Sequence, residues 1–571
     1  MKLGQGFADT LEFSRTKPKN KKTDWDEDEG FNNHARIAIF SLILLIFPLV
    51  LIGRLFYLQI IVGAQNRQIS EENRVRIKPL PAPRGIIFDR NDQILVRNIP
   101  GYRLKTQESY RVLSRDKALD VEAHGGMEAA NLEIDILREY LYPEIFAHVL
   151  GYTSEITQEE LKTYAKTDDY QGGDKVGRAG IEKEYEKTLR GQKGKEFIEV
   201  DAQEKKLGIL NEELSQPGQN LTLSFDLNLQ KSAYEALGNV RGVVVVSRPS
   251  DGQILALVSR PSFDPNLFTV DQDEEKIKQL FNDDREKPFL NRAISGVYPP
   301  GSTFKIVTAA AGLEEGKIDK STLIEDTGEI VIGPYRFPNW YLIQYGKTEG
   351  NLDVVGALKR SNDIFFYKTA GMVGEGELGK WAAKFGVGQK LGIPLEGESS
   401  GLMPNPQWKE KNIGEKWYLG DTYHIGIGQG YVLTTPLQVN FWTAVIANGG
   451  ILYKPLLVKS DQAVVIRKDF LKTETIDLIK KGMIEACSTG GTGWPLFDFK
   501  VGDRAIQTAC KTGTAEYGDP KGRTHAWFTV FAPAENPQIV ATVLVEGGGE
   551  GSNVGAPIAK KVLEEYFRDK Q

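Results

Sequence analysis

Hydrophobic and polar residues are mixed at short intervals along most of this chain, but one stretch near its beginning is apolar throughout. Residues 37–53, IAIFSLILLIFPLVLIG, contain no charged side chain, and LFYLQIIVG continues the apolar character beyond Arg54. A run of this length is at the short end for a membrane-spanning helix, but an arginine at its end can reach back to the interface. A cleavable signal peptide would begin nearer the N-terminus and end at a small-residue cleavage site. The pattern therefore predicts one uncleaved transmembrane anchor over residues 35–60.

Basic residues lie mainly before this stretch. Only Arg54 and Arg67 follow it within 20 residues, whereas the 20 residues before it contain Lys17, Lys19, Lys21, Lys22 and Arg36. Because positive charge is retained on the cytoplasmic side, residues 1–34 are predicted to be a cytoplasmic tail. The remainder of the chain is predicted to lie outside the cytoplasmic membrane, in the periplasm.

Beyond the anchor the pattern changes to short strands, turns and amphipathic helices. Residues 61–215 are predicted to form a mixed pedestal module without a large core of its own. It is expected to contain short strands at 86–88 and 94–96, one amphipathic helix over 177–191, and short strands with charged turns over 192–215. Residues 216–571 begin with a strand, a helix that Asp226 caps and two strands joined by a Ser-Asp-Gly turn. Two further strands and a helix over residues 556–566 close the chain. This order predicts an α+β domain, with an antiparallel sheet and a helical region inserted between its early and late strands.

Composition narrows the class of protein. The 571 residues include 26% charged residues, carry a net charge of −6 and have a mean hydropathy of −0.33. These values exclude a disordered chain and a multi-span membrane protein, and a nucleic-acid partner is not expected without a basic excess. The two cysteines, Cys487 and Cys510, are predicted to be buried thiols, with a disulfide as the alternative if the domain is exported.

Ser302 and Lys305 are the first candidates for chemistry. They lie in YPPGSTFKIVTAAAGL (298–313), where Pro-Pro-Gly stops the incoming chain and a buried helix is expected to begin at about Ser302. Residues three apart share a helical face, and a lysine whose pKa is lowered by burial can take the proton of a serine. The same spacing occurs at Ser14 and Ser114 in polar surroundings, so this pattern alone is weak.

Two further motifs follow Ser302 in order. Ser361-Asn362-Asp363 precedes an aromatic helix, and Lys511-Thr512-Gly513-Thr514 follows a short apolar stretch. On a strand edge, glycine lets a substrate backbone approach closely, and a lysine supplies a fixed positive charge for a carboxylate. The backbone N–H groups of Ser302 and Thr514 are candidates for an oxyanion hole. On a regular strand the side chain of Cys510 would point away from this site, and Trp527, Phe528 and Phe531 are predicted to pack in the core.

Ser-x-x-Lys, Ser-x-Asn/Asp and Lys-Thr-Gly in this order resemble the penicillin-recognising serine transpeptidases and β-lactamases. PRGIIFDRND (83–92) and GRAGIEKEYEKTLRG (177–191) are similar to the pedestal signatures of class B penicillin-binding proteins. WYLGDTYHIGIGQGYVLTTPLQ (417–438) and the single anchor are similar to the elongation-specific branch, the penicillin-binding protein 2 type. The resemblance covers about residues 35–568.

This resemblance implies both a fold and a reaction. The fold would be the α+β penicillin-binding transpeptidase fold, an antiparallel sheet flanked by helices plus an all-helical subdomain. The reaction would be the cross-linking of peptidoglycan stem peptides during cell-wall elongation. Ser302 would attack the penultimate D-alanine, with Lys305 as its base, and release the terminal D-alanine. An amine from a second stem peptide would then resolve the acyl-enzyme.

The resemblance also implies roles for the remaining motif residues. Ser361, with Lys511, would pass a proton to the leaving amine. Lys511, Thr512 and Thr514 would hold the carboxylate of the donor peptide or of a β-lactam, and Asp363 and Gly513 would complete the substrate-binding site. No cofactor is expected. Some relatives bind zinc between the first two motifs, but residues 315–360 contain neither His nor Cys, so no metal is predicted.

A division-type transpeptidase of the same class is the main alternative, and it would differ in partner rather than in chemistry. A β-lactamase would need a deacylating base and is usually compact, without pedestal or anchor. A β-lactam sensor would need more membrane spans, and a scaffold with a vestigial site would not keep every catalytic side chain. For the elongation type, the resemblance implies a polytopic shape-type glycosyltransferase as partner.

Overall fold

The structure is a computed structural model of the chain. It describes residues 30–105, 110–113, 115–124, 129–164, 170–201, 206–270, 273–460 and 462–568. The predicted cytoplasmic tail lies almost wholly outside these residues, as do Ser14 and Ser114. By internal contacts the chain divides into two compact units, residues 1–78 with 195–213 and residues 79–194 with 214–571.

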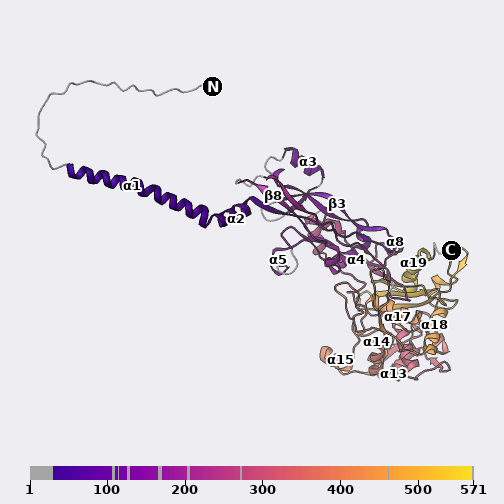
Figure 1. The fold of residues 1–571 in the computed structure, drawn as a ribbon. Coiled ribbons are helices and arrows are strands. Elements are labelled where there is room, and N and C mark those ends of the chain that lie inside the picture. The colour runs from indigo at the N-terminus through magenta and orange to yellow at the C-terminus, as the bar shows by residue number, and fades with distance from the viewer. Residues whose placement is uncertain are drawn as a thin grey trace, which may run out of the picture. The chain divides into compact units, whose positions relative to one another are not determined.

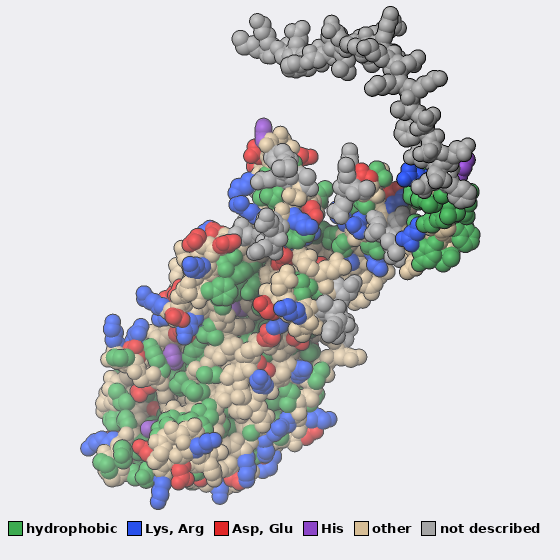
Figure 2. All heavy atoms as spheres, turned by 90° about the vertical axis from the view of Figure 1, so that its left-hand side faces the viewer, with side chains coloured by type: hydrophobic (Ala, Val, Ile, Leu, Met, Phe, Trp, Pro, Cys, Tyr) green, Lys and Arg blue, Asp and Glu red, His purple; other side chains and the backbone are tan. Residues whose placement is uncertain are grey.

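The first unit begins with the predicted membrane helix. α1 (Gly30–Phe56) continues through a π-helical turn, Tyr57–Ile61, and α2 (Gly63–Arg74) follows it. The segment His34–Ile61 is long and apolar enough to cross a membrane, and its large hydrophobic side chains are exposed. α1 is the long indigo helix of Figure 1, and its apolar side chains form a continuous green surface in Figure 2. A helix that is apolar all round requires an apolar environment, which agrees with the predicted anchor.

A three-stranded sheet completes the first unit. Its strands lie in the order β1-β8-β9, with β1 (Val75–Leu80), β8 (Gly194–Val200) and β9 (Lys206–Glu213). β8 and β9 confirm the strands predicted over residues 192–215, and they pair in antiparallel orientation.

The N-terminal part of the second unit is built on a five-stranded sheet. The order is β10-β2-β3-β4, and β5 also pairs with β3. The bounds are β2 (Ile87–Phe88), β3 (Ile94–Lys105), β4 (Tyr110–Leu113), β5 (Leu132–Tyr140) and β10 (Leu221–Thr222). A short strand was predicted at 94–96, but β3 is longer because it pairs with β5 over residues 96–104. Cross-strand ion pairs such as Arg97–Glu139 keep this polar extension in the sheet.

Short helices and strands surround this sheet. They are α3 (Arg115–His124), α4 (Pro143–Leu150), α5 (Gln158–Tyr164), α6 (Gly180–Glu184), α7 (Glu186–Leu189), β6 (Thr153–Glu155) and β7 (Lys175–Gly177). The single helix predicted over residues 177–191 is therefore wrong, because the chain leaves helical geometry at Tyr185. The two short helices each direct a glutamate, Glu182 and Glu186, at the Arg84 guanidinium.

The C-terminal part of the second unit contains the predicted antiparallel sheet. Its order is β12-β11-β23-β22-β21. The strands are β11 (Gly242–Ser247), β12 (Ile254–Arg260), β21 (Ala509–Glu516), β22 (Thr524–Ala532) and β23 (Ile539–Val545). The central strand β23 therefore comes last in sequence, and β21 lies at an edge.

Helices cover both faces of this sheet because its side chains alternate between two apolar clusters. Val244 and Val246 pack with α8 (Leu227–Leu237) and α19 (Ala556–Arg568), whereas Val243 and Val245 belong to the cluster that contains α17 (Pro436–Ala447). Asp226 caps α8 by accepting hydrogen bonds from the backbone N–H groups of Asn228 and Leu229, as predicted.

The region between the early and late strands is mainly helical, as predicted (Figure 1). Besides α17, its α-helices are α9 (Glu274–Phe281), α10 (Lys305–Glu314), α11 (Trp340–Tyr345), α12 (Val354–Arg360), α13 (Asp363–Val373), α14 (Glu375–Lys384), α15 (Pro406–Ile413), α16 (Leu419–Gly426) and α18 (Thr473–Ala486). Two-stranded sheets lie among them: β13 (Ile324–Asp326) with β16 (Gly350–Leu352), β14 (Glu329–Ile332) with β15 (Tyr335–Pro338), and β17 (Leu452–Tyr453) with β18 (Val465–Arg467). Another, β19 (Lys500–Val501) with β20 (Arg504–Ala505), precedes β21.

Candidate active site

Ser302 lies in a 3₁₀ turn, Gly301–Phe304, that leads directly into α10. The predicted helix start at Ser302 is therefore three residues early, but residues three apart are eclipsed in a 3₁₀ turn, so Ser302 and Lys305 still share a face. Gly301 has a φ of 53°, and a Cβ at this position would lie 2.7 Å from the Thr514 carbonyl oxygen. Glycine is needed here because it lets the serine turn approach β21 closely.

Ser361 lies at the break between α12 and α13. Its φ is 54°, a left-handed conformation that ends α12, and the side chain of Asn362 then caps α13 by accepting a hydrogen bond from the Phe365 N–H at 2.9 Å. A non-glycine residue with positive φ is uncommon and is frequently found at functional sites. The turn places the Ser361 hydroxyl next to the amino groups of two buried lysines.

Lys511 and Gly513 lie on β21, an edge strand of the five-stranded sheet β12-β11-β23-β22-β21, which is called the catalytic-domain sheet below. A Cβ at Gly513 would lie 3.1 Å from Thr303 Cγ2 and 3.2 Å from the Pro300 carbonyl oxygen, so this glycine permits β21 to lie against the serine turn. The carbonyl of Thr514 accepts a hydrogen bond at 3.4 Å from the side chain of Gln429. Since the N–H and C=O of one residue in an antiparallel strand point the same way, the Thr514 N–H also faces away from β22.

The side chains of all three motifs meet at Ser361. Lys511 Nζ donates to Ser361 Oγ at 2.7 Å, and Lys305 Nζ lies 3.5 Å from the same oxygen and donates to the Ser361 carbonyl at 2.7 Å. Both lysines are completely buried, and Ser361 is 5% exposed. The structure thus brings to Ser361 two lysines that are distant in sequence: Lys305 lies 56 positions before it and Lys511 lies 150 positions after it.

Burial lowers the pKa of the Lys305 ammonium below its ordinary value, although the Asp363 and Glu349 carboxylates oppose this shift. The pKa of Lys511 is lowered further, first by burial and then by the charge of Lys305. Two cations that share a water-poor site disfavour each other's charged form. Both shifts favour the neutral form of a lysine, which is the form that can accept a proton.

Asp363 was predicted to bind substrate, but its carboxylate is already engaged within the protein. One oxygen accepts a hydrogen bond from Lys305 at 2.6 Å, and the other accepts one from the backbone N–H of Trp340 at 2.9 Å. Asp363 is therefore placed to orient Lys305.

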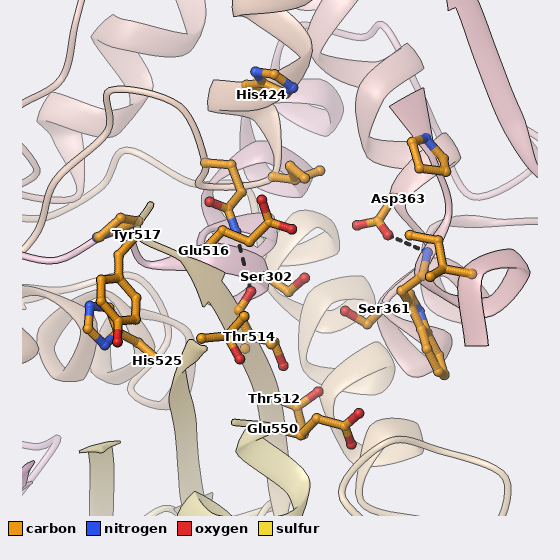
Figure 3. A pocket seen from close by; sticks show the side chains of 18 of the residues that line it. Ser302, Ser361, Asp363, His424, Thr512, Thr514, Glu516, Tyr517, His525 and Glu550 are labelled. Carbon is orange, nitrogen blue, oxygen red and sulfur yellow. Dashed lines mark hydrogen bonds between the residues drawn. The ribbon is translucent and has the colours of Figure 1, made fainter. Parts of the chain in front are cut away.

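A groove of about 1410 Å³ runs past these residues. Figure 3 shows Ser302, Ser361, Thr512 and Thr514 around one hollow, with Asp363 above Ser361. Aromatic side chains form part of the wall, including Tyr517, which stacks on the ring of His525 with centroids 4.0 Å apart. The groove is open at the surface, as a site for a peptide substrate requires.

Cys487 and Cys510 are bonded in a disulfide, so the predicted pair of buried thiols is wrong. The bond ties the end of α18 to β21, next to Lys511. Cys510 is fully buried in the cluster with α8 and α19, which agrees with the prediction that its side chain points away from the site. The packing role predicted for Trp527, Phe528 and Phe531 is confirmed, since all three are fully buried.

Sequence reasoning missed the residues that hold Asp363 in place, Asn339 and Trp340. Asn339 is fully buried and lies in a segment with ordinary turn composition. The sequence marks Asn339 only by its position just before a short aromatic helix, and an asparagine at that position is also typical of an ordinary helix cap.

Three features are together typical of serine acyltransferases of the penicillin-recognising class. They are the turn that holds Ser302, the Ser361 hydroxyl between two buried lysines, and the edge strand with Lys-Thr-Gly. The family described as "Penicillin binding protein transpeptidase domain" matches residues 242–564, and "Penicillin-binding Protein dimerisation domain" matches residues 111–223. The chain therefore belongs to the penicillin-binding protein transpeptidase family, and the second match identifies the pedestal of its class B members.

Individual relatives narrow this assignment. The peptidoglycan D,D-transpeptidase MrdA of Haemophilus influenzae is 32% identical, with 94% of this chain and 92% of that protein covered. The structure of penicillin-binding protein 2 from Helicobacter pylori, solved in complex with MreC, has a TM-score of 0.76 at 28% identity and covers 87% of this chain and 99% of that one. A chain of a peptidoglycan synthase complex that coordinates polymerization and crosslinking has a TM-score of 0.72 at 29% identity over 95% and 99%. This chain is thus a class B D,D-transpeptidase of the elongation type, the penicillin-binding protein 2 branch.

Proposed function

We propose that this chain cross-links peptidoglycan stem peptides through an acyl-enzyme on Ser302. Lys305 takes the proton of the Ser302 hydroxyl as its oxygen attacks the carbonyl carbon of the penultimate D-alanine. The bond to the terminal D-alanine then breaks. The amine of a second stem peptide attacks the resulting ester, and Ser302 regains its proton.

Ser361 is proposed to carry the proton to the leaving amine. Its hydroxyl receives a hydrogen bond from Lys511 at 2.7 Å and lies 3.5 Å from Lys305 Nζ, so a proton taken by Lys305 can pass through Ser361 to the departing nitrogen. This bridging position of Ser361 between two buried lysines, beside Ser302, is the observation that carries the proposal. Lys511, Thr512 and Thr514 hold the carboxylate of the donor or of a β-lactam.

The oxyanion hole is proposed to consist of the Ser302 and Thr514 backbone N–H groups. The Thr514 N–H faces away from β22, and Gly301 and Gly513 allow the serine turn and β21 to pack closely. Fixed N–H donors are suited to stabilising the developing negative charge of the tetrahedral intermediate, and loss of one such donor typically costs about 10²–10³-fold in rate.

A fluorescent penicillin tests this assignment. It should label the full-length protein in detergent at Ser302, as located by peptide mapping, because the strained lactam carbonyl replaces the peptide carbonyl. Ser302→Ala should abolish labelling, whereas Ser321→Ala, at an exposed serine, should not affect it. Labelling that survives Ser302→Ala would refute the proposed nucleophile.

The positions of the domains and partners are proposed from the same comparisons. The proposed parts are a cytoplasmic tail over residues 1–34, the membrane anchor over 35–60, the pedestal over 61–215 and the transpeptidase domain over 216–571. The transpeptidase domain is proposed to lie in the periplasm. The partners are a polytopic shape-type glycosyltransferase and an MreC-type protein, since a relative was solved with MreC and another in a synthase complex. Affinity capture from membranes that contain both the elongation and the division glycosyltransferase should recover the former, and recovery of the latter alone would contradict this proposal.

A further inference from the structure

The backbone of Asp363 is fixed by a buried asparagine. Asn339 is fully buried, and its side-chain oxygen accepts a hydrogen bond from the Asp363 N–H at 3.0 Å. Its side-chain nitrogen donates to Asp326 at 2.9 Å, and its own backbone N–H donates to the Gly328 carbonyl at 2.7 Å. Both ends of the amide are therefore used, and they connect β13 to the start of α13.

Asp326 is the fixed end of this connection. It is 3% exposed, and besides the Asn339 amide it accepts hydrogen bonds from the backbone N–H groups of Gly328 at 2.8 Å and Glu349 at 3.0 Å. Three donors on one buried carboxylate hold it in a single orientation and compensate for its burial.

Neighbouring contacts hold the rest of the Ser361 turn. The Glu349 carboxylate accepts hydrogen bonds from Arg360 Nε at 2.5 Å and from the Asn362 side chain at 3.0 Å. Trp340, next to Asn339, donates its backbone N–H to the Asp363 carboxylate and its indole N–H to the Arg360 carbonyl at 3.0 Å. Residues 339 and 340 thus hold Asp363 at both its backbone and its side chain.

The orientation of Asp363 matters because its other carboxylate oxygen contacts Lys305 at 2.6 Å. In its ammonium form Lys305 Nζ has three hydrogens, and its nearest acceptors are Asp363 and the Ser361 carbonyl and hydroxyl. Movement of Asp363 would let Lys305 Nζ turn away from Ser361.

We propose that Asn339 is a positioning residue for acylation. It fixes Asp363, and through Asp363 it fixes the direction of Lys305 Nζ toward the reacting serines. This inference rests on the proposed role of Lys305 as the base.

Such a role has a pH signature that simple packing would not have. The charged groups that face Lys305 are Asp363 and Glu349, which favour its ammonium form, and Lys511, which disfavours it. If Asp363 loses its fixed contact with Lys305, burial dominates and the lysine loses its proton at lower pH. The acid limb of the acylation rate should then move to lower pH, while the maximal rate falls because the amine is misdirected.

The experiment measures the rate of acylation by a fluorescent penicillin as a function of pH, with full-length protein in detergent. Asn339→Ala is expected to lower the maximal rate by about 10–100-fold, by analogy with the loss of a hydrogen-bond partner that orients a metal ligand, and to move the acid limb to lower pH. Asn351→Ala is the matched control, since this asparagine is exposed on β16, the partner strand of β13. A wild-type rate for Asn339→Ala, or a loss that is equal at every pH, would overturn the inference.

A second pair of variants keeps the test decisive if Asn339→Ala does not fold. Asn339→Asp places a second carboxylate against Asp326. Asp326→Asn with Asn339→Asp restores a donor–acceptor pair between residues 326 and 339, although the Glu349 N–H, which shares the same Asp326 oxygen, then loses its acceptor. The rescue is therefore partial, and the double variant should acylate several-fold faster than Asn339→Asp, with its acid limb moved back toward the wild-type position. Equal rates for the two would overturn the inference. Labelling that persists in Ser302→Ala would instead refute the proposed function, so the two failures are distinguishable.

Discussion

Glu182 is the most deeply buried charge of the pedestal, and its neutralisation should destabilise that part of the chain severely. Its side chain is fully buried between two arginines that are themselves 9% and 2% exposed. Arg84 Nη2 donates to it at 2.7 Å, and Arg138 Nε donates to it at 2.7 Å. In Glu182→Gln the side chain keeps its size, but two guanidinium groups lose their shared counter-charge.

The expected cost follows from this geometry. Removing one partner of a buried, hydrogen-bonded ion pair typically costs about 3–5 kcal/mol because the remaining charge stays desolvated. Glu186 still pairs with Arg84, at 2.8 Å, so Arg138 bears most of the loss. The matched control is Glu139→Gln, which breaks the exposed Arg97–Glu139 pair of the same sheet and should cost about 0–1 kcal/mol.

Hydrogen exchange of the full chain in detergent measures this cost locally, which suits a protein with several parts. Amides of β3 and β5 should exchange about 10²–10⁴-fold faster in Glu182→Gln, which corresponds to 3–5 kcal/mol. Burial alone would raise the pKa of Glu182, but Arg138 and Arg84 lower it below its ordinary value. The stabilisation is therefore present above the pKa of an unfolded glutamate and is lost as the pH falls through the lower, folded value. Exchange rates in Glu182→Gln equal to those in Glu139→Gln would refute the reasoning.

Two further predictions concern the active site. Lys305→Ala should slow acylation by about 10²–10⁴-fold, the usual contribution of a general base. The control Lys380→Ala, at an exposed lysine, should leave the acylation rate unchanged. Equal acylation rates in the two variants would show that Lys305 is not the base. The disulfide closes a loop between residues 23 apart, so replacing both Cys487 and Cys510 by alanine should cost about 3 kcal/mol. Faster hydrogen exchange confined to β21 and the end of α18 would confirm this, and unchanged exchange there would contradict it.

Local patterns along the sequence predicted the elements that hold the catalytic groups. Asp226 before α8 and the Ser-Asp-Gly turn between β11 and β12 are signals that neighbouring residues decide, and the structure agrees with both. Pro-Pro-Gly before Ser302 is a third such signal, although the α-helix begins three residues later than predicted. The pairing of Cys487 with Cys510 depends instead on α18 meeting β21, which the order of residues does not reveal. The length of β3 was underestimated for the same reason, since β5 supplies its hydrogen bonds.

The candidate site shows the same division. Ser302, Lys305, Ser361 and Lys511 could be named from their spacing because each motif is short and carries its own turn or strand signal. Asn339 and Asp326 could not, because their importance lies in hydrogen bonds to residues that are 24 and 13 positions away. Buried polar residues that act on a neighbour leave no periodic trace in the sequence.

The strand order of the catalytic-domain sheet also bears on when this enzyme can first act during its biosynthesis. β23, in the middle of the sheet, is made last, after both the turn that holds Ser302 and the strand that holds Lys511. A nascent chain released or stalled before residue 539 would carry all three motifs and still lack the strand that joins β11 to β22. Reactivity toward penicillins should therefore appear abruptly near the end of synthesis and export, which would prevent half-made chains from forming covalent bonds with the cell wall.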